Sequence, residues 1–160
     1  MILTFLTAGL DCAVLVPTEK EDTDHAVGYS LVAPTPWVTQ GKTQGDRAYL
    51  LPSGCVVTMT SSCSRSADAP LDVLTKHLLI GSRHVAIEKR ETWIVDGTQG
   101  LHSKLKATFE GKPFFLELFV LPKAGCVFDF TLISKSPLAA NDSQQFSEFI
   151  RSFHYDTTKG

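Results

Sequence analysis

The stretch from Glu91 to Ser134 constrains the fold most, because it reads as four strands separated by three tight turns. Each turn is marked by a dipeptide that ends in glycine: Asp96-Gly97, Glu110-Gly111 and Ala124-Gly125. Glycine supplies the positive φ that a two-residue hairpin loop needs, and Val, Ile, Phe, Leu and Thr between the turns favour strands. No connection is long enough for a parallel crossover, so the stretch is predicted to be an antiparallel meander.

The turn at Glu110-Gly111 also predicts the register of the central hairpin. Leu105 then faces Leu116 on one side of the sheet, and the side chains of Lys104 and Lys106 lie with Glu117 on the other. We therefore expect Glu117 to pair with one of these lysines, for at most about 1 kcal/mol if the pair is exposed. The strand over 114–121 is apolar on both faces except at Glu117, which is typical of a covered strand near the sheet centre.

Composition limits the function more than it defines it. A chain of 160 residues with 43% hydrophobic and 20% charged residues is expected to form one globular domain. The formal net charge of −2 argues against a nucleic-acid partner. The sequence contains no P-loop, no dinucleotide-binding glycine motif and no serine-hydrolase elbow, so neither a cofactor nor an enzyme activity is predicted. The four cysteines form no Cys-x-x-Cys pair, and no metal site is expected.

Residues 1–26 are expected to lie outside the folded domain. The chain is apolar through Leu10, and this run is too short to cross a membrane. It has the length of the apolar region of a secretory signal, which would make Cys12 a lipidated N-terminus followed by a polar tether over 17–26. The basic start of a signal is absent, however, and Asp11 interrupts the small residues before the cysteine. An apolar arm packed on the domain is the alternative.

Two helices flank the meander in the sequence. The first is predicted to open at Pro70 and to end at Gly81, with leucines at 71, 74 and 78 on one side. The second is predicted from a capping box formed by Asp142 and Gln145. Its apolar residues recur at helical spacing and must bury against the sheet: Phe146, Phe149, Ile150 and Phe153. A strand from Gly28 and a hairpin over 47–62 precede the first helix.

The order of these pieces resembles the PsbP-like superfamily, the fold of the Mog, PsbP and DcrB proteins. Five pieces of residues 27–155 carry the resemblance: Gly28-Tyr-Ser-Leu-Val-Ala-Pro-Thr-Pro-Trp37, His77-Leu-Leu-Ile-Gly81, Val95-Asp-Gly97, Gly125-Cys-Val-Phe-Asp-Phe130 and the Phe-x-x-Phe-Ile-x-x-Phe pattern of 146–153. The resemblance implies one α+β domain over 27–156, an α/β/α sandwich with a central antiparallel sheet of about six or seven strands and two flanking helices. The sequence is similar above all to small envelope lipoproteins of Gram-negative bacteria.

A disulfide between Cys63 and Cys126 is predicted if the compartment is oxidising. Cys63 ends the second strand of the early hairpin and Cys126 opens the last strand. If these strands are antiparallel neighbours, the two Cβ atoms lie near the roughly 3.8 Å that a disulfide needs. Two free thiols are the alternative, and a cytoplasmic location would favour them.

The remaining candidates point to binding rather than to chemistry. Trp37 and Trp93 are candidates for a ligand or partner surface, with a role in the core as the alternative. His102 is expected to be solvated beside Lys104. The resemblance implies a non-catalytic, extracytoplasmic binding or assembly protein of the cell envelope, which would bind another protein or a small ligand and contact the membrane only through a lipid on Cys12. A cytoplasmic chaperone or adaptor of the same fold is the alternative.

Overall fold

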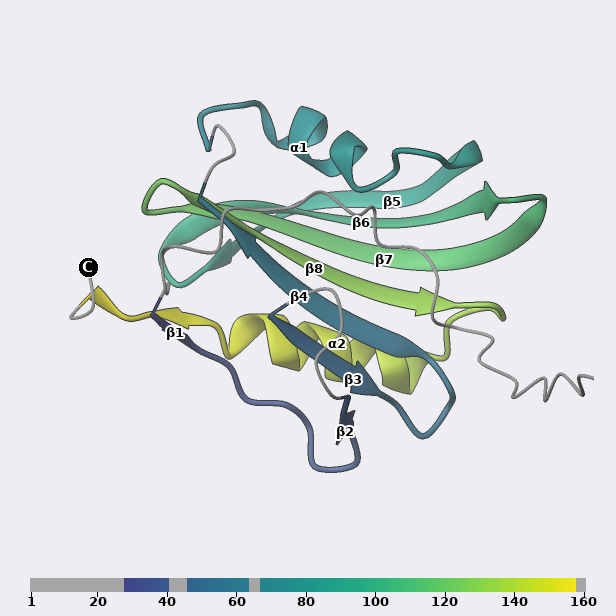
Figure 1. Cartoon of the computed structure of the whole chain (residues 1–160), viewed down its shortest axis with the longest axis horizontal. Helices are drawn as coiled ribbons and strands as arrows, with labels where there is room; N and C mark the ends of the chain where they lie inside the picture. Colours follow the sequence, from purple (N-terminus) through teal and green to yellow (C-terminus); the bar gives the residue numbers. More distant parts are fainter. Residues whose placement is uncertain (1–27, 41–45, 64–66, 158–160) are drawn as a thin grey trace, which may run out of the picture.

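The computed structural model describes residues 28–40, 46–63 and 67–157. Within these residues the chain forms short and long strands and two helices, in this order: β1 Tyr29–Ser30, β2 Val38–Thr39, β3 Arg47–Leu50, β4 Val56–Ser62, α1 Leu71–His77, β5 Arg83–Val95, β6 Thr98–Phe109, β7 Lys112–Lys123, β8 Cys126–Ser134, α2 Ala140–Arg151 and β9 His154–Tyr155. The two helices lie on opposite sides of the main sheet (Figure 1). The fold is therefore α+β, as predicted, and forms an α/β/α sandwich.

The main sheet has seven strands in the order β2-β3-β4-β8-β7-β6-β5, and every neighbouring pair is antiparallel. The predicted meander is confirmed as β5 to β8. At each of its turns both central residues have positive φ, as a type I′ hairpin requires: Asp96-Gly97, Glu110-Gly111 and Ala124-Gly125. The predicted register is also confirmed, with Leu105 opposite Leu116 and Lys104 opposite Glu117.

The two faces of the sheet bury different side chains. On the α1 side, Leu74 packs with Val120 and Val127. On the α2 side the core is aromatic, and Phe128 and Phe130 of β8 meet the buried residues of the second helix and its end: Phe146, Phe149, Ile150 and Phe153. The predicted inward stripe of this helix is confirmed. Among the helices described, none combines the length and the apolar character that a membrane span needs.

Three local predictions need correction. Helix α1 ends at His77, before the predicted end at Gly81, and a turn covers the residues between them. Helix α2 begins earlier than expected, after Ala139, so the predicted capping box does not form and no side chain caps the helix. Asp142 instead lies in the first turn, where its carboxylate suits the helix dipole and lies 3.6 Å from Cys55 Sγ. The strand predicted from Gly28 is only two residues long and belongs to a separate sheet, because β1 pairs with β9. The short strands β2 and β9 carry no sequence signal of their own.

Candidate functional site

The candidate site is a set of ionisable and aromatic side chains where the α2 side of the sheet continues past the aromatic core onto β5, β6 and β7. We call it the His–Glu cluster and define it by four residues: Glu91 and Trp93 of β5, His102 of β6 and Glu117 of β7. Glu91 lies directly opposite His102, and alternation along each strand places all four side chains on the same face. The cluster therefore follows from the meander's register.

At the centre of the cluster is a buried ion-pair contact. His102 Nε2 lies 2.6 Å from Glu117 Oε1, and each side chain is only 4% exposed. The second ring nitrogen, Nδ1, lies 3.5 Å from Glu91 Oε1 at the solvent side. The hydrogen bond from Lys89 is the main cause that lowers the pKa of Glu91 below its ordinary value. A single imidazole thus lies between an outer and an inner carboxylate.

The indole of Trp93 covers this pair. It stacks on the His102 ring with centroids 4.0 Å apart and planes 8° apart, and the Arg151 guanidinium lies 4.8 Å from the indole centroid. Phe119 fills the space beneath, and it does so because Gly100 has no side chain. A Cβ on Gly100 would lie 2.4 Å from the Phe119 ring. The stack therefore depends on a glycine opposite Trp93 in the β5–β6 ladder.

Two polar atoms of the cluster lack a hydrogen-bond partner. Among the described residues, neither Glu117 Oε2 nor His102 Nδ1 has a hydrogen-bond partner, although both atoms are buried. A buried carboxylate oxygen without a donor is costly, by about 1–3 kcal/mol. An arrangement of this kind can accept a hydrogen bond from a ligand or pass a proton between carboxylates. It also corrects two predictions: His102 is not solvated, and Glu117 pairs with histidine instead of lysine.

The tryptophans predicted for a partner surface are separated by the fold. Trp37 is 7% exposed and packs against Tyr49 and Phe149, and its Nε1 donates to Gln145 Oε1 at 3.0 Å. Burial makes Trp37 a core residue and leaves it no ligand surface, whereas Trp93 lies partly exposed in the cluster. Cys12, the predicted lipidation site, lies outside the described residues.

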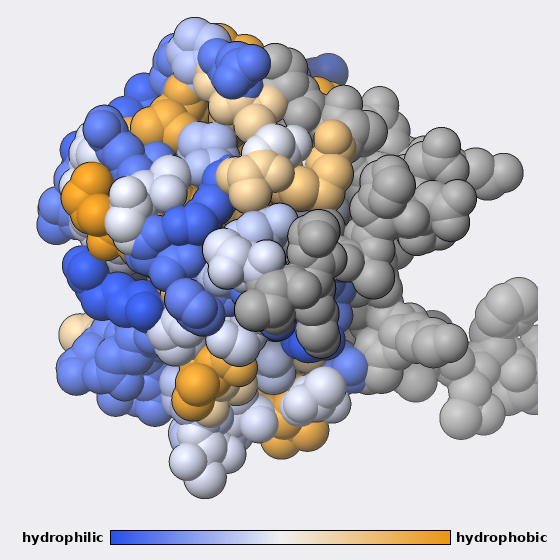
Figure 2. Space-filling model, turned by 90° about the vertical axis from the view of Figure 1, so that its left-hand side faces the viewer, coloured by the Kyte–Doolittle hydropathy of each residue, from blue (hydrophilic) through white to orange (hydrophobic). Residues whose placement is uncertain are grey.

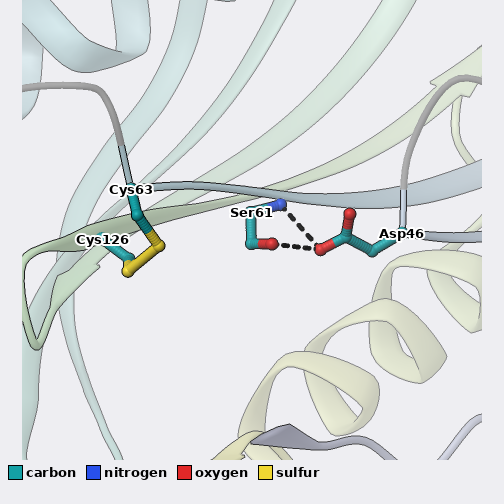
Figure 3. The surroundings of a disulfide bond; sticks show 4 residues. All are labelled: Asp46, Ser61, Cys63 and Cys126. Carbon is teal, nitrogen blue, oxygen red and sulfur yellow. Dashed lines mark hydrogen bonds between the residues drawn. A yellow bond between two sulfur atoms is a disulfide. The ribbon is translucent and has the colours of Figure 1, made fainter. Parts of the chain in front are cut away.

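The structure joins Cys63 to Cys126 in a disulfide. The reason is the predicted one, since β4 and β8 are antiparallel neighbours with Ser62 opposite Val127. The bond closes the end of β4 onto the start of β8, and the nearby Asp46 carboxylate accepts hydrogen bonds from the Ser61 amide and hydroxyl (Figure 3). Cys55 is the free cysteine among the described residues, and it is buried. No group of three or more potential ligands in the described part of the chain is placed to hold a metal ion.

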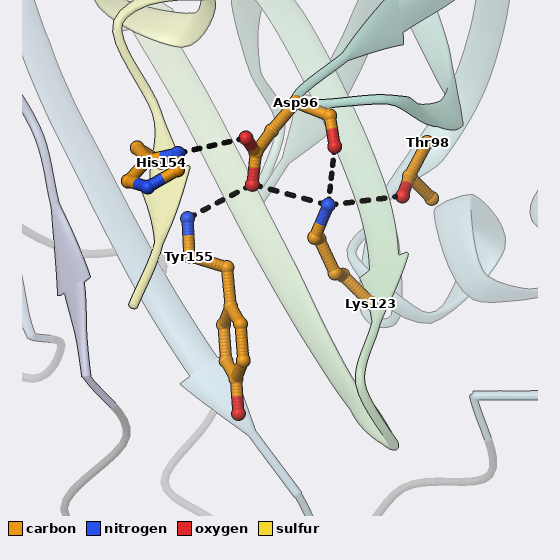
Figure 4. Close-up of polar contacts among 5 residues, drawn as sticks. All are labelled: Asp96, Thr98, Lys123, His154 and Tyr155. Carbon is orange, nitrogen blue, oxygen red and sulfur yellow. Dashed lines mark hydrogen bonds and ion pairs between the residues drawn. The ribbon is translucent and has the colours of Figure 1, made fainter. Parts of the chain in front are cut away.

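A second polar group fastens the chain's end to the meander. Asp96, in the β5–β6 turn, contacts Lys123 Nζ at 3.1 Å and His154 Nδ1 at 2.9 Å, and it accepts a hydrogen bond from the Tyr155 amide (Figure 4). Partial burial acts to raise the pKa of Asp96, but the Tyr155 amide, His154 and Lys123 outweigh it and lower that pKa. We name this group the Asp96 clamp; its role is structural, because it links β5, β7 and β9.

Sequence reasoning missed the His–Glu cluster and the clamp. The parity of the central hairpin does place His102 and Glu117 on one face, but they are diagonal neighbours, and the lysine directly opposite was the more obvious partner. The only signal for the clamp is an aspartate at a turn, and most such aspartates are solvated.

Comparison with known proteins identifies the fold. No protein-family model matches the chain, and no curated protein matches it. Among solved structures, the cyanobacterial PsbP of Synechocystis matches with a TM-score of 0.60 and 14% identity over 81% of this chain and 87% of that one. LpqN of Mycobacterium tuberculosis, described as involved in cell envelope biogenesis, matches with a TM-score of 0.58 and 9% identity over 82% and 86%.

A third match is a larger protein. A protein of Bacteroides thetaiotaomicron matches with a TM-score of 0.56 and 13% identity over 81% of this chain, which spans only 45% of that one. At these identities the matches establish the fold alone. The chain has a PsbP-like fold, as the sequence pattern implied.

Proposed function

We propose that the protein is a non-catalytic binding or assembly protein of the cell envelope, outside the cytoplasm, held to the membrane by a lipid on Cys12. The observation that carries the proposal is the disulfide between Cys63 and Cys126. Disulfides persist in oxidising compartments and are rare in the cytosol, where thiols are kept reduced. Because this bond joins two adjacent strands of the main sheet, it is part of the folded structure.

Two further observations support this location. The fold is shared with LpqN, which is described as involved in cell envelope biogenesis. The apolar run before Cys12 and the polar segment after it are arranged as in the precursor of a lipoprotein. One acyl chain binds a membrane weakly, so stable attachment through Cys12 would need several chains.

The partner, another protein or a small ligand, is proposed to bind at the rim of the His–Glu cluster. Trp93 is partly exposed there, with Arg151 above it and Glu91 beside it. Aromatic and arginine side chains are the residues most enriched at binding sites. Below them, the unpaired oxygen of Glu117 is a buried acceptor, which a bound donor would reach if the side chains covering the cluster moved aside. Binding without chemistry is the simplest use of this arrangement.

Non-reducing peptide mapping of protein from the native cell tests the location. We expect a linked peptide containing Cys63 and Cys126, in the envelope fraction. The loop that the bond closes spans 63 residues, so reduction should destabilise the fold by about 4 kcal/mol in urea melts. Free thiols at both positions in protein from the cytosol would contradict the proposal and favour a chaperone or adaptor of the same fold.

Site-specific photocrosslinking tests the binding face. A photoreactive residue at Lys104, on the cluster's face, should give an adduct with the partner in native envelopes. The matched control is Lys76, which is exposed on α1 at the opposite side of the sheet. Adducts of equal yield from both positions, or from neither, would remove the cluster's rim as the binding surface.

A further inference from the structure

Strand β5 is the most exposed long element of the fold. It forms one edge of the seven-stranded sheet, and among the described strands only β6 lies beside it. All of its side chains from Arg83 to Arg90 are exposed. Three of its large apolar residues remain in water, with Val85 42%, Ile87 49% and Ile94 62% exposed. An edge of this length carries a row of unpaired backbone groups that can pair with another strand.

The side chains of β5 are sorted between the two faces by its pairing with β6. Lys89 and Glu91 lie on the α2 side, opposite Lys104 and His102. Ile87 and Thr92 lie on the α1 side, opposite Leu105 and Leu101. Glu88 is an extra residue in the ladder, because the register shifts between Ile87 and Lys89. Alternation then places Ile94 on the α1 side as well. Val85 lies within a second register shift, between Arg83 and Ala86.

We propose that β5 pairs antiparallel with β5 of a second copy of this chain, about a two-fold axis at Arg90. Lys89 and Glu91, which lie 3.0 Å apart within one chain, then each face the opposite charge of the second copy, and the symmetry makes this contact twice. With Glu88 as the extra residue, Ile87 faces Thr92, and Ile94 lies opposite the irregular segment that holds Val85. The two sheets join into one, and both His–Glu clusters lie on the same face of it.

Charge complementarity selects this register. An axis at Lys89 would put Ile87 opposite Arg90, and an axis at Glu91 would put the two Glu91 side chains together without any opposite-charge pair. The axis at Arg90 also brings two like charges together, which costs free energy. This contact is single, however, whereas the Lys89–Glu91 pair occurs twice. Charges in the middle of an edge strand usually block pairing. Here, however, Lys89 and Glu91 face each other when β5 runs antiparallel to a second β5.

Charge exchange tests the pairing in the intact protein by sedimentation equilibrium. We expect a monomer–dimer equilibrium for the parent protein. K89E should weaken dimerisation by about tenfold, since it places like charges opposite each other at two positions. The double variant K89E/E91K should restore dimerisation, and Arg90→Thr should tighten it. The matched control is Lys112→Glu, which changes the same charge at the start of β7 and should have no effect.

Crosslinking of a single introduced cysteine tests the register of the β5–β5 pair. With Cys12 replaced by Ser, Arg90→Cys should crosslink to itself under mild oxidation, whereas Lys112→Cys should not; native Cys55 is buried and Cys63 and Cys126 are already bonded. A parent protein that stays monomeric at all concentrations would overturn the proposal, and so would a dimer that K89E leaves unchanged. Self-crosslinking of Glu91→Cys in place of Arg90→Cys would overturn the axis. A protein monomeric in itself but binding another protein's strand at β5 would likewise contradict pairing with a second copy.

Discussion

Strands β8 and β5 belong to the same sheet but meet opposite surroundings. Every residue of β8 is buried except the half-buried Thr131, whereas β5 is exposed over its first eight residues. Strand β8 lies between two long neighbours and under both helical layers; β5 has one neighbour. The sequences reflect this, since β8 has a single charged residue, Asp129, whereas β5 is charged along its middle. Stability is concentrated at β8, and surface available for binding is concentrated near β5.

The positions of the exposed apolar residues agree with this contrast between β8 and β5. Seen from the end that carries the β5–β6 and β7–β8 turns, hydrophobic residues form separate small patches between hydrophilic ones (Figure 2). The large apolar side chains left in water include Ile94 and Ile80, and the latter lies just before β5. Among the described residues no aromatic side chain belongs to this group, and most of the aromatic residues lie in the core around β8.

Replacing Phe149 with Ala should have the largest effect and tests the core around β8. Phe149 is fully buried and contacts Trp37, Tyr49 and Phe130. We expect a loss of about 3–5 kcal/mol in the free energy of unfolding, measured by urea melts. The matched variant on β5 is Ile94→Ala, which should cost less than about 0.5 kcal/mol because the side chain is exposed. Equal losses in the two variants would refute the contrast.

Replacing Gly100 with Ala tests the boundary between the core and the cluster. The added Cβ would meet the Phe119 ring at 2.4 Å and the Val120 carbonyl oxygen at 2.7 Å, so Phe119 must move. We expect a loss of about 1–3 kcal/mol in unfolding free energy and a change in Trp93 fluorescence, because Phe119 lies beneath the indole.

The neighbouring residue supplies a control for this variant. Gln99→Ala changes an exposed side chain of the same strand and should alter neither stability nor fluorescence. If Gly100→Ala is as stable as the parent protein, the close packing of Phe119 against β6 does not occur.

The sequence predicted the parts of the fold that depend on local rules. The turns were predictable because Gly97, Gly111 and Gly125 follow residues that tolerate positive φ or are forced into it by a two-residue loop. The alternation of side chains then predicted the register of β6 on β7. The disulfide was predictable only on the condition that β4 and β8 are neighbours, which is a tertiary fact.

The cluster was less predictable because its geometry depends on how several side chains pack together. Glu117 has a lysine directly opposite and a histidine diagonally opposite, and burial beneath Trp93 favours the planar imidazole. A lysine ammonium, in contrast, is strongly hydrated and stays near water. The burial of Trp37 was equally hidden, since it depends on Gln145 and Phe149, more than a hundred residues away in the chain.

The smallest effect is expected at the far end of β5, where the Asp96 clamp fastens an otherwise exposed strand to β7 and β9. Asp96→Asn keeps the shape and tolerates the positive φ of 49° at this turn, so it removes little besides charge. At pH 7 we expect a loss of about 1 kcal/mol or less, because the ion pairs are partly exposed. The matched control is Glu110→Gln, an exposed residue with a φ of 48° at the equivalent position of the next turn.

The dependence of this loss on pH separates charge from shape. The folded protein holds the pKa of Asp96 below its ordinary value, so its carboxylate stabilises the fold fully above the unfolded pKa of about 3.9. That contribution is lost as the pH falls through the lower, folded pKa. The stabilities of the parent protein and Asp96→Asn, measured by urea melts, should therefore differ above about pH 3.9 and converge as the pH falls below it. A difference that persists unchanged into acid would mean that the amide disturbs the hydrogen bond from the Tyr155 amide, and that charge contributes nothing at the end of β5.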